Sequence, residues 1–163
     1  MMILDLGCGK NKNPGSIGVD IGLDSMADVI CDLDHASYPF KGNYFDTVIS
    51  KQVFEHLDDI ARTLREIHRV CRNKGKLTVE VPHFSCFFSY GDPTHKRTFS
   101  VFSFDKLAPA CGFRILTRQI TFHKAFRRYK INAFANRFPL GYERFWAFIF
   151  PAEHLHFEFE VLK

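Results

Sequence analysis

The chain has 163 residues, of which 46% are hydrophobic and 25% are charged, and its formal net charge is +4. This length suits one domain with a buried core, and the small positive charge permits an anionic partner without requiring one. The apolar runs fall far short of the ~20 residues of a membrane-spanning helix, and no signal peptide is predicted ahead of the first strand. Five cysteines without a CxxC spacing disfavour a disulfide framework. Composition therefore predicts one cytoplasmic domain rather than a secreted or membrane-spanning protein.

The first residues predict a buried parallel strand that leads into a glycine turn. Residues 3–6 are apolar around Asp5, and Gly7 and Gly9 follow at Gly-x-Gly spacing. Glycine has no Cβ atom, so a ligand can approach the backbone here, although a tight turn that binds nothing has the same pattern. A second strand at 16–21 follows after a loop shorter than the ~10–12 residues that a crossover with its helix needs. We therefore expect the first crossover helix to be reduced to a turn or missing.

The later segments alternate between strands and helices. Four are rich in β-branched and apolar residues, as buried strands are: 27–33, 45–50, 76–82 and 113–118. Residues 59–71 carry one apolar stripe and predict a helix, and Ser103 is expected to cap a short helix that ends near Ala110. Residues 155–161 alternate strictly, as in an antiparallel strand. This order predicts an α/β open sheet with its ligand at the carboxyl ends of the strands.

Three acids accompany the first three predicted strands, namely Asp5, Asp20 and Asp32. In a nucleotide-type site, the acid after the second strand accepts hydrogen bonds from both ribose hydroxyls. A phosphate would need a helix N-terminus at the glycine turn, and that helix is expected to be missing. The pattern therefore favours a cofactor without phosphates over a dinucleotide.

A series of motifs resembles those of class I S-adenosylmethionine-dependent methyltransferases, especially the small type 11 group. The motifs are Asp5-Leu6-Gly7-Cys8-Gly9, Gly18-Val19-Asp20, Cys31-Asp32-Leu33, residues 45–57, Lys74-Gly75-Lys76-Leu77 and Cys111-Gly112-Phe113. The resemblance covers roughly residues 3–120 and the final strand. It implies a Rossmann-like open sheet of seven strands, mostly parallel with an antiparallel last strand, and the cofactor S-adenosyl-L-methionine. Relative to that fold the chain lacks the N-terminal helices, which predicts either a homodimer or weak cofactor affinity.

The same resemblance implies which residues bind the cofactor. They are Asp5, Gly7, Cys8, Gly9, Asp20, Ile21, Asp32, Leu33, Ser50 and Lys51. The glycine turn would lie against the methionyl part, with Asp5 near its amino group. Asp20 would bind the ribose, and Asp32 with Leu33 would frame the adenine. Ser50 and Lys51 would line the methyl side.

Polar residues after the fifth strand mark the side where a substrate is expected to enter. His83 and His95 are the candidate general bases, with a structural hydrogen-bonding role as the alternative for each. His56 is expected to be structural or to lie beside the cofactor. His83, Cys86 and His95 make an incomplete zinc set with unusual spacing, so no metal is predicted.

An aromatic and basic insertion is predicted at about 122–151 within a single methyltransferase-like domain of residues 1–163. It could form a lid over an apolar substrate, contact an anionic membrane as a peripheral segment, bind nucleic acid, or simply pack on the sheet. Pro139 and Pro151 exclude one long helix. The low net charge makes nucleic acid the least favoured partner.

These features predict an S-adenosylmethionine-dependent methyltransferase that acts on a small-molecule or lipid-like substrate. The sulfonium methyl group is already activated, so alignment of the nucleophile is the main requirement. The alternative is a catalytically silent relative that binds the cofactor or a protein partner. A Rossmann-type dehydrogenase is a third possibility, which the short loop after Gly9 disfavours.

Overall fold

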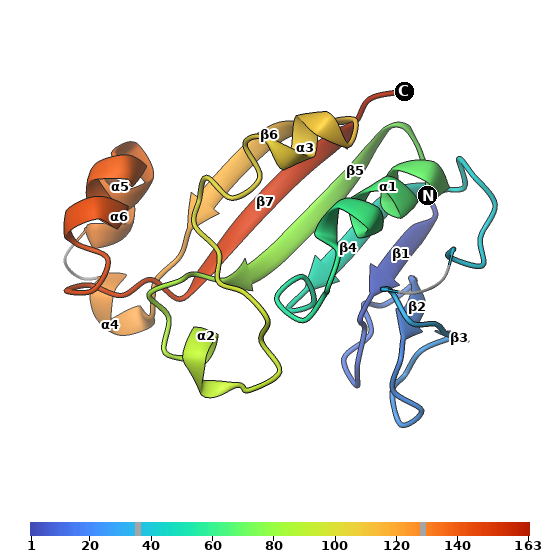
Figure 1. Ribbon diagram of the computed structural model, residues 1–163, viewed down its shortest axis with the longest axis horizontal. Coiled ribbons are helices and arrows are strands. Elements are labelled where there is room, and N and C mark those ends of the chain that lie inside the picture. Colours follow the sequence, from blue (N-terminus) through green and yellow to red (C-terminus); the bar gives the residue numbers. More distant parts are fainter. Residues whose placement is uncertain (35–36, 128–129) are drawn as a thin grey trace.

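A single seven-stranded sheet forms the centre of the computed structural model, which describes residues 1–34, 37–127 and 130–163 (Figure 1). The strands are β1 (Ile3–Leu6), β2 (Ile17–Asp20), β3 (Val29–Ile30), β4 (Phe45–Lys51), β5 (Cys71–Pro82), β6 (Phe113–Ile120) and β7 (His154–Val161). Their order is β3-β2-β1-β4-β5-β7-β6. The first five are parallel, and β7 runs antiparallel to both of its neighbours. The predicted fold class is confirmed.

The connection between β1 and β2 contains no helix, as expected. These strands are parallel neighbours joined by residues 7–16. The buried Asp5 carboxylate accepts hydrogen bonds from the backbone N of Asn13 at 2.7 Å and from Asn13 Nδ2 at 2.8 Å. These bonds fold the loop back over the end of β1. A buried carboxylate therefore holds the short crossover in place without a helix.

Six helices are described: α1 (Ile60–Val70), α2 (Phe88–Gly91), α3 (Leu107–Ala110), α4 (Lys124–Arg127), α5 (Ile131–Arg137) and α6 (Pro139–Phe145). Asp59 caps α1 by accepting from the backbone N of Arg62 at 2.9 Å. The buried stripe of Ile60, Leu64 and Ile67 is the predicted one. The helix ends directly at Cys71, so β5 starts five residues before the predicted boundary at 76.

The predicted cap of the short helix at 103–110 is wrong. Ser103 Oγ accepts a hydrogen bond from the backbone N of Ser100 at 2.9 Å, so it closes a turn instead of a helix. α3 starts only at Leu107 and has no side-chain cap. The helix ends at Ala110, as the sequence predicts, and Gly112 follows with φ +83°.

One face of the sheet is covered and apolar, and the other is polar along its last strand. The side chains of Leu155, Phe157, Phe159 and Val161 on β7 are fully buried, on the face that α1 and α3 cover (Figure 1). Phe104 packs edge-on against Phe157 and Phe159, at 4.9 and 5.4 Å between ring centroids. The intervening His156, Glu158 and Glu160 are exposed or half-buried. The alternation of apolar and polar residues thus determines which face of β7 packs into the core.

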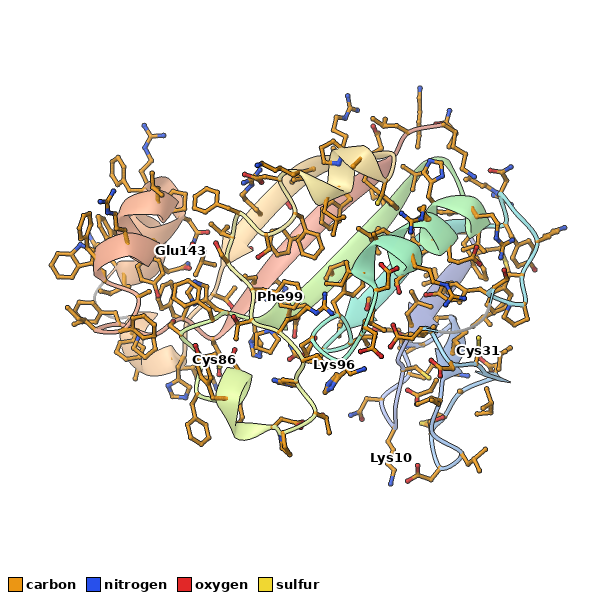
Figure 2. All side chains as sticks on the ribbon, viewed as in Figure 1. Lys10, Cys31, Cys86, Lys96, Phe99 and Glu143 are labelled. Carbon is orange, nitrogen blue, oxygen red and sulfur yellow. The ribbon has the colours of Figure 1, made fainter. Side chains whose placement is uncertain are left out.

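The insertion between β6 and β7 folds into three short helices, α4 to α6, beyond the ends of these strands (Figure 1). Pro139 opens α6, and residues 128 and 129 lie outside the described part. Asn136 docks α5 on the end of β6, since its side chain accepts from Ile120 N and donates to Ile120 O, both at 2.8 Å. Aromatic side chains crowd the outside of this segment (Figure 2), and Phe138, Phe145 and Phe148 are exposed. None of the described helices is long and apolar enough to cross a membrane.

Candidate functional site

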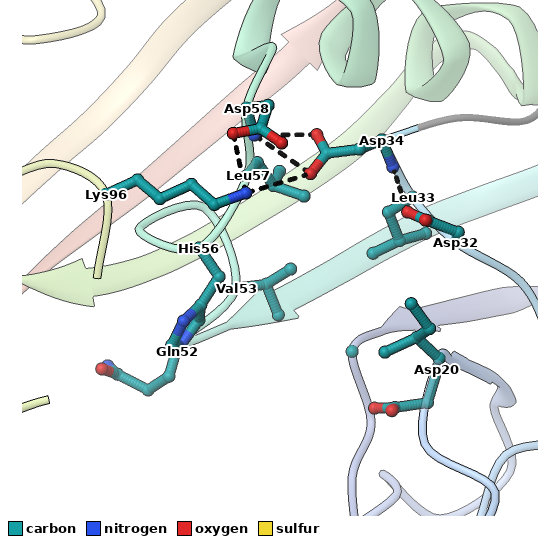
Figure 3. Close-up of a pocket in the computed structure, with 12 residues that line it drawn as sticks. Asp20, Asp32, Leu33, Asp34, Gln52, Val53, His56, Leu57, Asp58 and Lys96 are labelled. Atoms are coloured by element: carbon teal, nitrogen blue, oxygen red, sulfur yellow. Dashed lines mark hydrogen bonds and ion pairs between the residues drawn. The ribbon is translucent and has the colours of Figure 1, made fainter. Parts of the chain in front are cut away.

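A cavity of about 410 Å³ lies at the carboxyl ends of β1, β2 and β4 (Figure 3). It is lined by Gly7, Asp20, Ile21, Asp32, Leu33, Asp34, Gln52, Val53, His56, Leu57, Asp58 and Lys96. Ligands of open α/β sheets bind at this edge. Five of the ten residues predicted for the cofactor line the cavity, namely Gly7, Asp20, Ile21, Asp32 and Leu33.

Gly7, the first residue of the glycine turn, lines the cavity. Gly7 has φ +63°, and a Cβ atom built on it would lie 2.3 Å from Val53 Cγ2. Any other residue would therefore meet both a strained backbone and a steric clash. The backbone N of Gly7 donates to Val19 O at 2.8 Å, which ties the turn to β2.

Asp20 joins the glycine turn to the loop that follows β2. Its Oδ2 accepts from the backbone N of Gly9, and its Oδ1 accepts from the backbone N of Gly22, both at 2.8 Å. A carboxylate oxygen has a second acceptor site. The two bonds therefore fix the orientation of the carboxylate and leave it able to accept from hydroxyl groups in the cavity.

The lining is rich in negative charge. It contains four carboxylates, Asp20, Asp32, Asp34 and Asp58, and one lysine. Lys96 Nζ lies 2.7 Å from Asp58 Oδ1 and 3.9 Å from Asp34 Oδ2 (Figure 3). This excess of carboxylates favours a cationic ligand and disfavours phosphates.

The other predicted cofactor residues lie outside the cavity lining. Asp5 is held by Asn13, and Lys51 Nζ lies 3.4 Å from Asn13 Oδ1, so both point into the β1–β2 connection. Ser50 is fully buried. Cys8 is buried too, and burial together with the nearby Asp20 and Asp5 raises the pKa of its thiol. Gly9 supplies a backbone N–H to Asp20, which places it behind that carboxylate.

His83 does not reach the cavity. Its side chain is 0% exposed, and its Nδ1 accepts from the backbone N of Ser85 at 3.1 Å. Its Nε2 lies 3.3 Å from Glu143 Oε1. Both nitrogens are thus engaged inside the protein, one by Ser85 and the other by Glu143 of α6. The geometry favours the structural alternative for His83 over the role of general base.

Glu143 connects the insertion to the core. Its carboxylate accepts from Ser100 Oγ at 2.6 Å and from the backbone N of Val101 at 2.7 Å, in addition to the contact with His83. Burial alone would raise the pKa of Glu143, but the hydrogen bonds from His83, Ser100 and Val101 outweigh it and lower this pKa. Glu143 was not a predicted site residue, since its partners are more than 40 residues away in sequence.

His95 packs beside His56 at the rim of the cavity. The two ring centroids are 4.8 Å apart, and the backbone N of Lys96 donates to Glu55 O at 2.8 Å, which joins their loops. Glu55 is fully buried, and burial raises its pKa to about 7. His56 itself lines the cavity. Of the two predicted bases, only His95 therefore lies close to the cavity.

Sequence reasoning missed the wall formed by the loop after β4. Gln52, Val53, Leu57 and Asp58 line the cavity, and Gln52 adopts φ +55°, which is uncommon for a residue with a side chain. Residues 52–57 of this loop belong to the motif 45–57, in which the sequence predicted roles only for Ser50, Lys51 and His56. Its position directly after a parallel strand was the available signal.

Comparisons with known proteins agree with this fold. Residues 4–79 match the Methyltransf_11 family of methyltransferase domains. The Methanocaldococcus jannaschii protein MJ0638, described as uncharacterized, is 34% identical over 49% of this chain and 40% of its own length. The chain therefore spans well under half of that relative.

Two solved structures have the same fold at low sequence identity. A SAM-dependent methyltransferase from Archaeoglobus fulgidus has a TM-score of 0.73 at 19% identity, over 98% of this chain and 85% of its own. The phosphoethanolamine N-methyltransferase 2 of Haemonchus contortus, solved with S-adenosyl-L-methionine, has a TM-score of 0.65 at 16% identity, over 99% of this chain and 48% of its own.

The seven-stranded sheet and the cavity at its carboxyl edge define a protein of the class I methyltransferase fold. The match to the type 11 group of methyltransferase domains extends over residues 4–79, which is 76 of the 163 residues. This similarity favours S-adenosyl-L-methionine as the cofactor. The carboxylate-rich lining fits its cationic sulfonium and amino groups.

Proposed function

We propose that this protein transfers a methyl group from S-adenosyl-L-methionine to a small-molecule or lipid-like substrate. The supporting observation is the carboxylate-lined cavity over Gly7, at the edge of the sheet where open α/β folds bind their ligands. We treat residues 1–163 as one methyltransferase-like domain with an insertion at about 122–151.

Five residues are proposed to hold the cofactor. Asp20 accepts from the ribose hydroxyls, because its orientation is fixed by Gly9 and Gly22 and its oxygens retain acceptor capacity. Asp32 and the apolar Ile21 and Leu33 enclose the adenine. Gly7 leaves room for the amino-acid tail, since no Cβ atom projects from the turn. When bound, the cofactor supplies an activated methyl group.

The residues proposed to activate the nucleophile lie at the opposite rim of the cavity. His56 lines the cavity, and His95 packs against it. These imidazoles are positioned to accept a proton from an oxygen or nitrogen nucleophile, whereas the buried His83 is not. A carbon nucleophile needs less assistance, and alignment by the cavity wall then dominates.

The insertion supports the lipid-like substrate class. It contains an apolar cavity of about 250 Å³ lined by Ile131, Phe134, Tyr142, Trp146 and Phe150. Arg137 and Arg144 lie over the rings of the exposed Phe138 and Phe145, so cationic and aromatic groups share one surface. Such a surface suits peripheral contact with anionic lipid. Homodimer formation stays a prediction of the sequence.

The proposed function is tested by cofactor binding and then by methyl transfer. Isothermal titration of S-adenosylhomocysteine should give at least a tenfold weaker Kd for Asp20→Asn than for the wild type, equivalent to about 1.4 kcal/mol. Asp24→Asn is the matched control, because Asp24 is exposed and pairs with Lys10 outside the lining. Equal affinity in all three proteins would contradict the proposed site.

Radiolabelled methyl transfer into lysate fractions separates the enzyme from its alternative. Incorporation that depends on the wild-type protein supports the methyltransferase. Tight binding of the demethylated cofactor without any transfer supports the catalytically silent protein instead. Binding of a nicotinamide cofactor in place of S-adenosylhomocysteine would favour a dehydrogenase.

A further inference from the structure

Three metal-ligating side chains converge where two loops meet beside the cavity. Glu55 and His56 follow β4, His95 follows α2, and one ligand atom from each lies within 4.8 Å of the others. The backbone N of Lys96 donates a hydrogen bond to Glu55 O at 2.8 Å, and this bond joins the two loops. Ligand atoms around a cation with bonds of about 2.1 Å lie about 3–4 Å apart. Small side-chain rotations would therefore bring the three atoms to coordinating distance.

The buried atoms of this cluster lack partners within the described part of the chain. Glu55 is 0% exposed, and neither of its carboxylate oxygens has a hydrogen-bond partner there. The side chain of His95 is 8% exposed, and its Nδ1 likewise has no partner there. Buried polar atoms are normally satisfied. One cation would satisfy the carboxylate and the imidazole together.

Neighbouring residues set the tautomer of His56. Thr94 Oγ1 donates its hydrogen to Asp92 Oδ1 at 2.6 Å, and the Thr94 carbonyl oxygen can only accept. His56 Nδ1 lies 3.0 Å from Thr94 Oγ1 and 3.3 Å from Thr94 O, so Nδ1 must carry the hydrogen. The neutral ring then presents an unprotonated Nε2, which is the form that binds a metal. Metal-bound histidines are commonly oriented by such outer hydrogen bonds.

We propose that Glu55, His56 and His95 bind a divalent transition-metal cation of the zinc type. Two imidazoles and one carboxylate match the ligand preferences of such cations, whereas magnesium and calcium prefer oxygen ligands throughout. Three protein ligands leave at least one coordination position for water or a ligand oxygen.

The cluster lies between two cavities. His56 lines the cofactor cavity, and His95 lines a second one of about 390 Å³, while Lys96 lines both. A cation here could hold an oxygen of the acceptor substrate at the boundary between them. This role for the cation rests on the proposed methyl transfer, but the metal site itself does not. With the cation bound, the metal replaces His56 and His95 as the group that activates the acceptor oxygen, because the free imidazole lone pairs are then used for coordination. Coordination to the metal narrows the acceptor substrate to a molecule with an oxygen donor that reaches the cation.

The test is metal binding by the full chain after treatment with EDTA and dialysis. Co²⁺ followed by its visible absorption, and Zn²⁺ in competition with a chromophoric chelator, should each show one equivalent bound. Glu55→Gln and His95→Asn should each weaken Zn²⁺ affinity at least 100-fold. Thr94→Val should weaken it about tenfold, as expected of an outer hydrogen-bond partner.

His156→Asn is the matched control, because His156 also lies beside a carboxylate, at 3.2 Å from Glu80. It should leave Zn²⁺ affinity unchanged. No stoichiometric binding, or equal affinity in the control and in Glu55→Gln, would overturn the proposal and indicate a metal-free hydrogen-bonded cluster. Glu55→Gln keeps nearly the same shape, so the test stands even where His95→Asn fails to fold.

S-adenosylhomocysteine titration of the same samples separates this proposal from the proposed function. Wild-type protein that binds S-adenosylhomocysteine but no Zn²⁺ contradicts the metal site alone. Wild-type protein that binds Zn²⁺ in a manner that depends on Glu55 and His95, but binds no S-adenosylhomocysteine, supports the metal site and contradicts only the proposed function.

Discussion

Removal of the Glu143 carboxylate should weaken the packing of the insertion against the core. Glu143 accepts hydrogen bonds of 2.6 Å from Ser100 and 2.7 Å from Val101, and it faces the fully buried His83. A hydrogen bond to a charged group contributes about 1.5–3 kcal/mol. With the two short bonds at the lower end of that range, Glu143→Ala should lower the free energy of unfolding by about 3 kcal/mol. Glu143→Gln keeps one acceptor oxygen and should therefore lower the free energy of unfolding by a smaller amount.

The pH dependence follows from the lowered pKa of Glu143. A carboxyl group with a lower pKa in the folded state stabilises the protein above its unfolded pKa, which is about 4.3 for glutamate. That stabilisation is lost as the pH falls from there through the folded value. The difference in stability between the wild type and Glu143→Gln should therefore be full at neutral pH and shrink below about pH 4.

Urea denaturation followed by two probes is the appropriate assay. Trp146 is the single tryptophan and follows α6, so its fluorescence reports on the insertion, whereas far-ultraviolet circular dichroism reports on the whole sheet. Glu158→Ala is the control, because Glu158 is exposed on β7, and it should change stability by less than about 0.5 kcal/mol. If Glu143→Ala behaves like Glu158→Ala by both probes, the reasoning is refuted.

Two further substitutions test local geometry. Gly7→Ala should destabilise the protein by about 3 kcal/mol in urea denaturation, because the positive φ and the contact with Val53 add together. Gly9→Ala should cost only about 1 kcal/mol, since its Cβ would meet nothing within 4 Å; equal losses at the two positions would argue against the clash. Asp59→Ala should cost about 1 kcal/mol through loss of the α1 cap, and Asp59→Ser should recover most of it. A thermal midpoint unchanged in Asp59→Ala would contradict the capping role.

The sequence by itself determined the succession of strands, the helix at 60–70 and the resemblance to methyltransferase domains. Strand and helix periods are local, so alternation on β7 and the apolar stripe of α1 could be read without tertiary contacts. Gly7 was identifiable because only glycine suits a left-handed turn with a close neighbour. The missing first crossover helix followed from the length of the loop alone.

Only the tertiary structure decided which polar residues face the cavity. Asp5 lies near the end of β1 and Asp20 at the end of β2. Asn13 nevertheless binds the Asp5 carboxylate, because the short crossover folds back over β1. The buried His83 contacts Glu143, which lies 60 residues further along the chain. His56 contacts Thr94, the residue before His95, which is 38 residues away in sequence. No local sequence pattern predicts such long-range contacts, because they depend on how the loops at the sheet edge pack. The physical reason is that hydrogen bonds and burial between distant segments, rather than residue type, assign each carboxylate and imidazole its role.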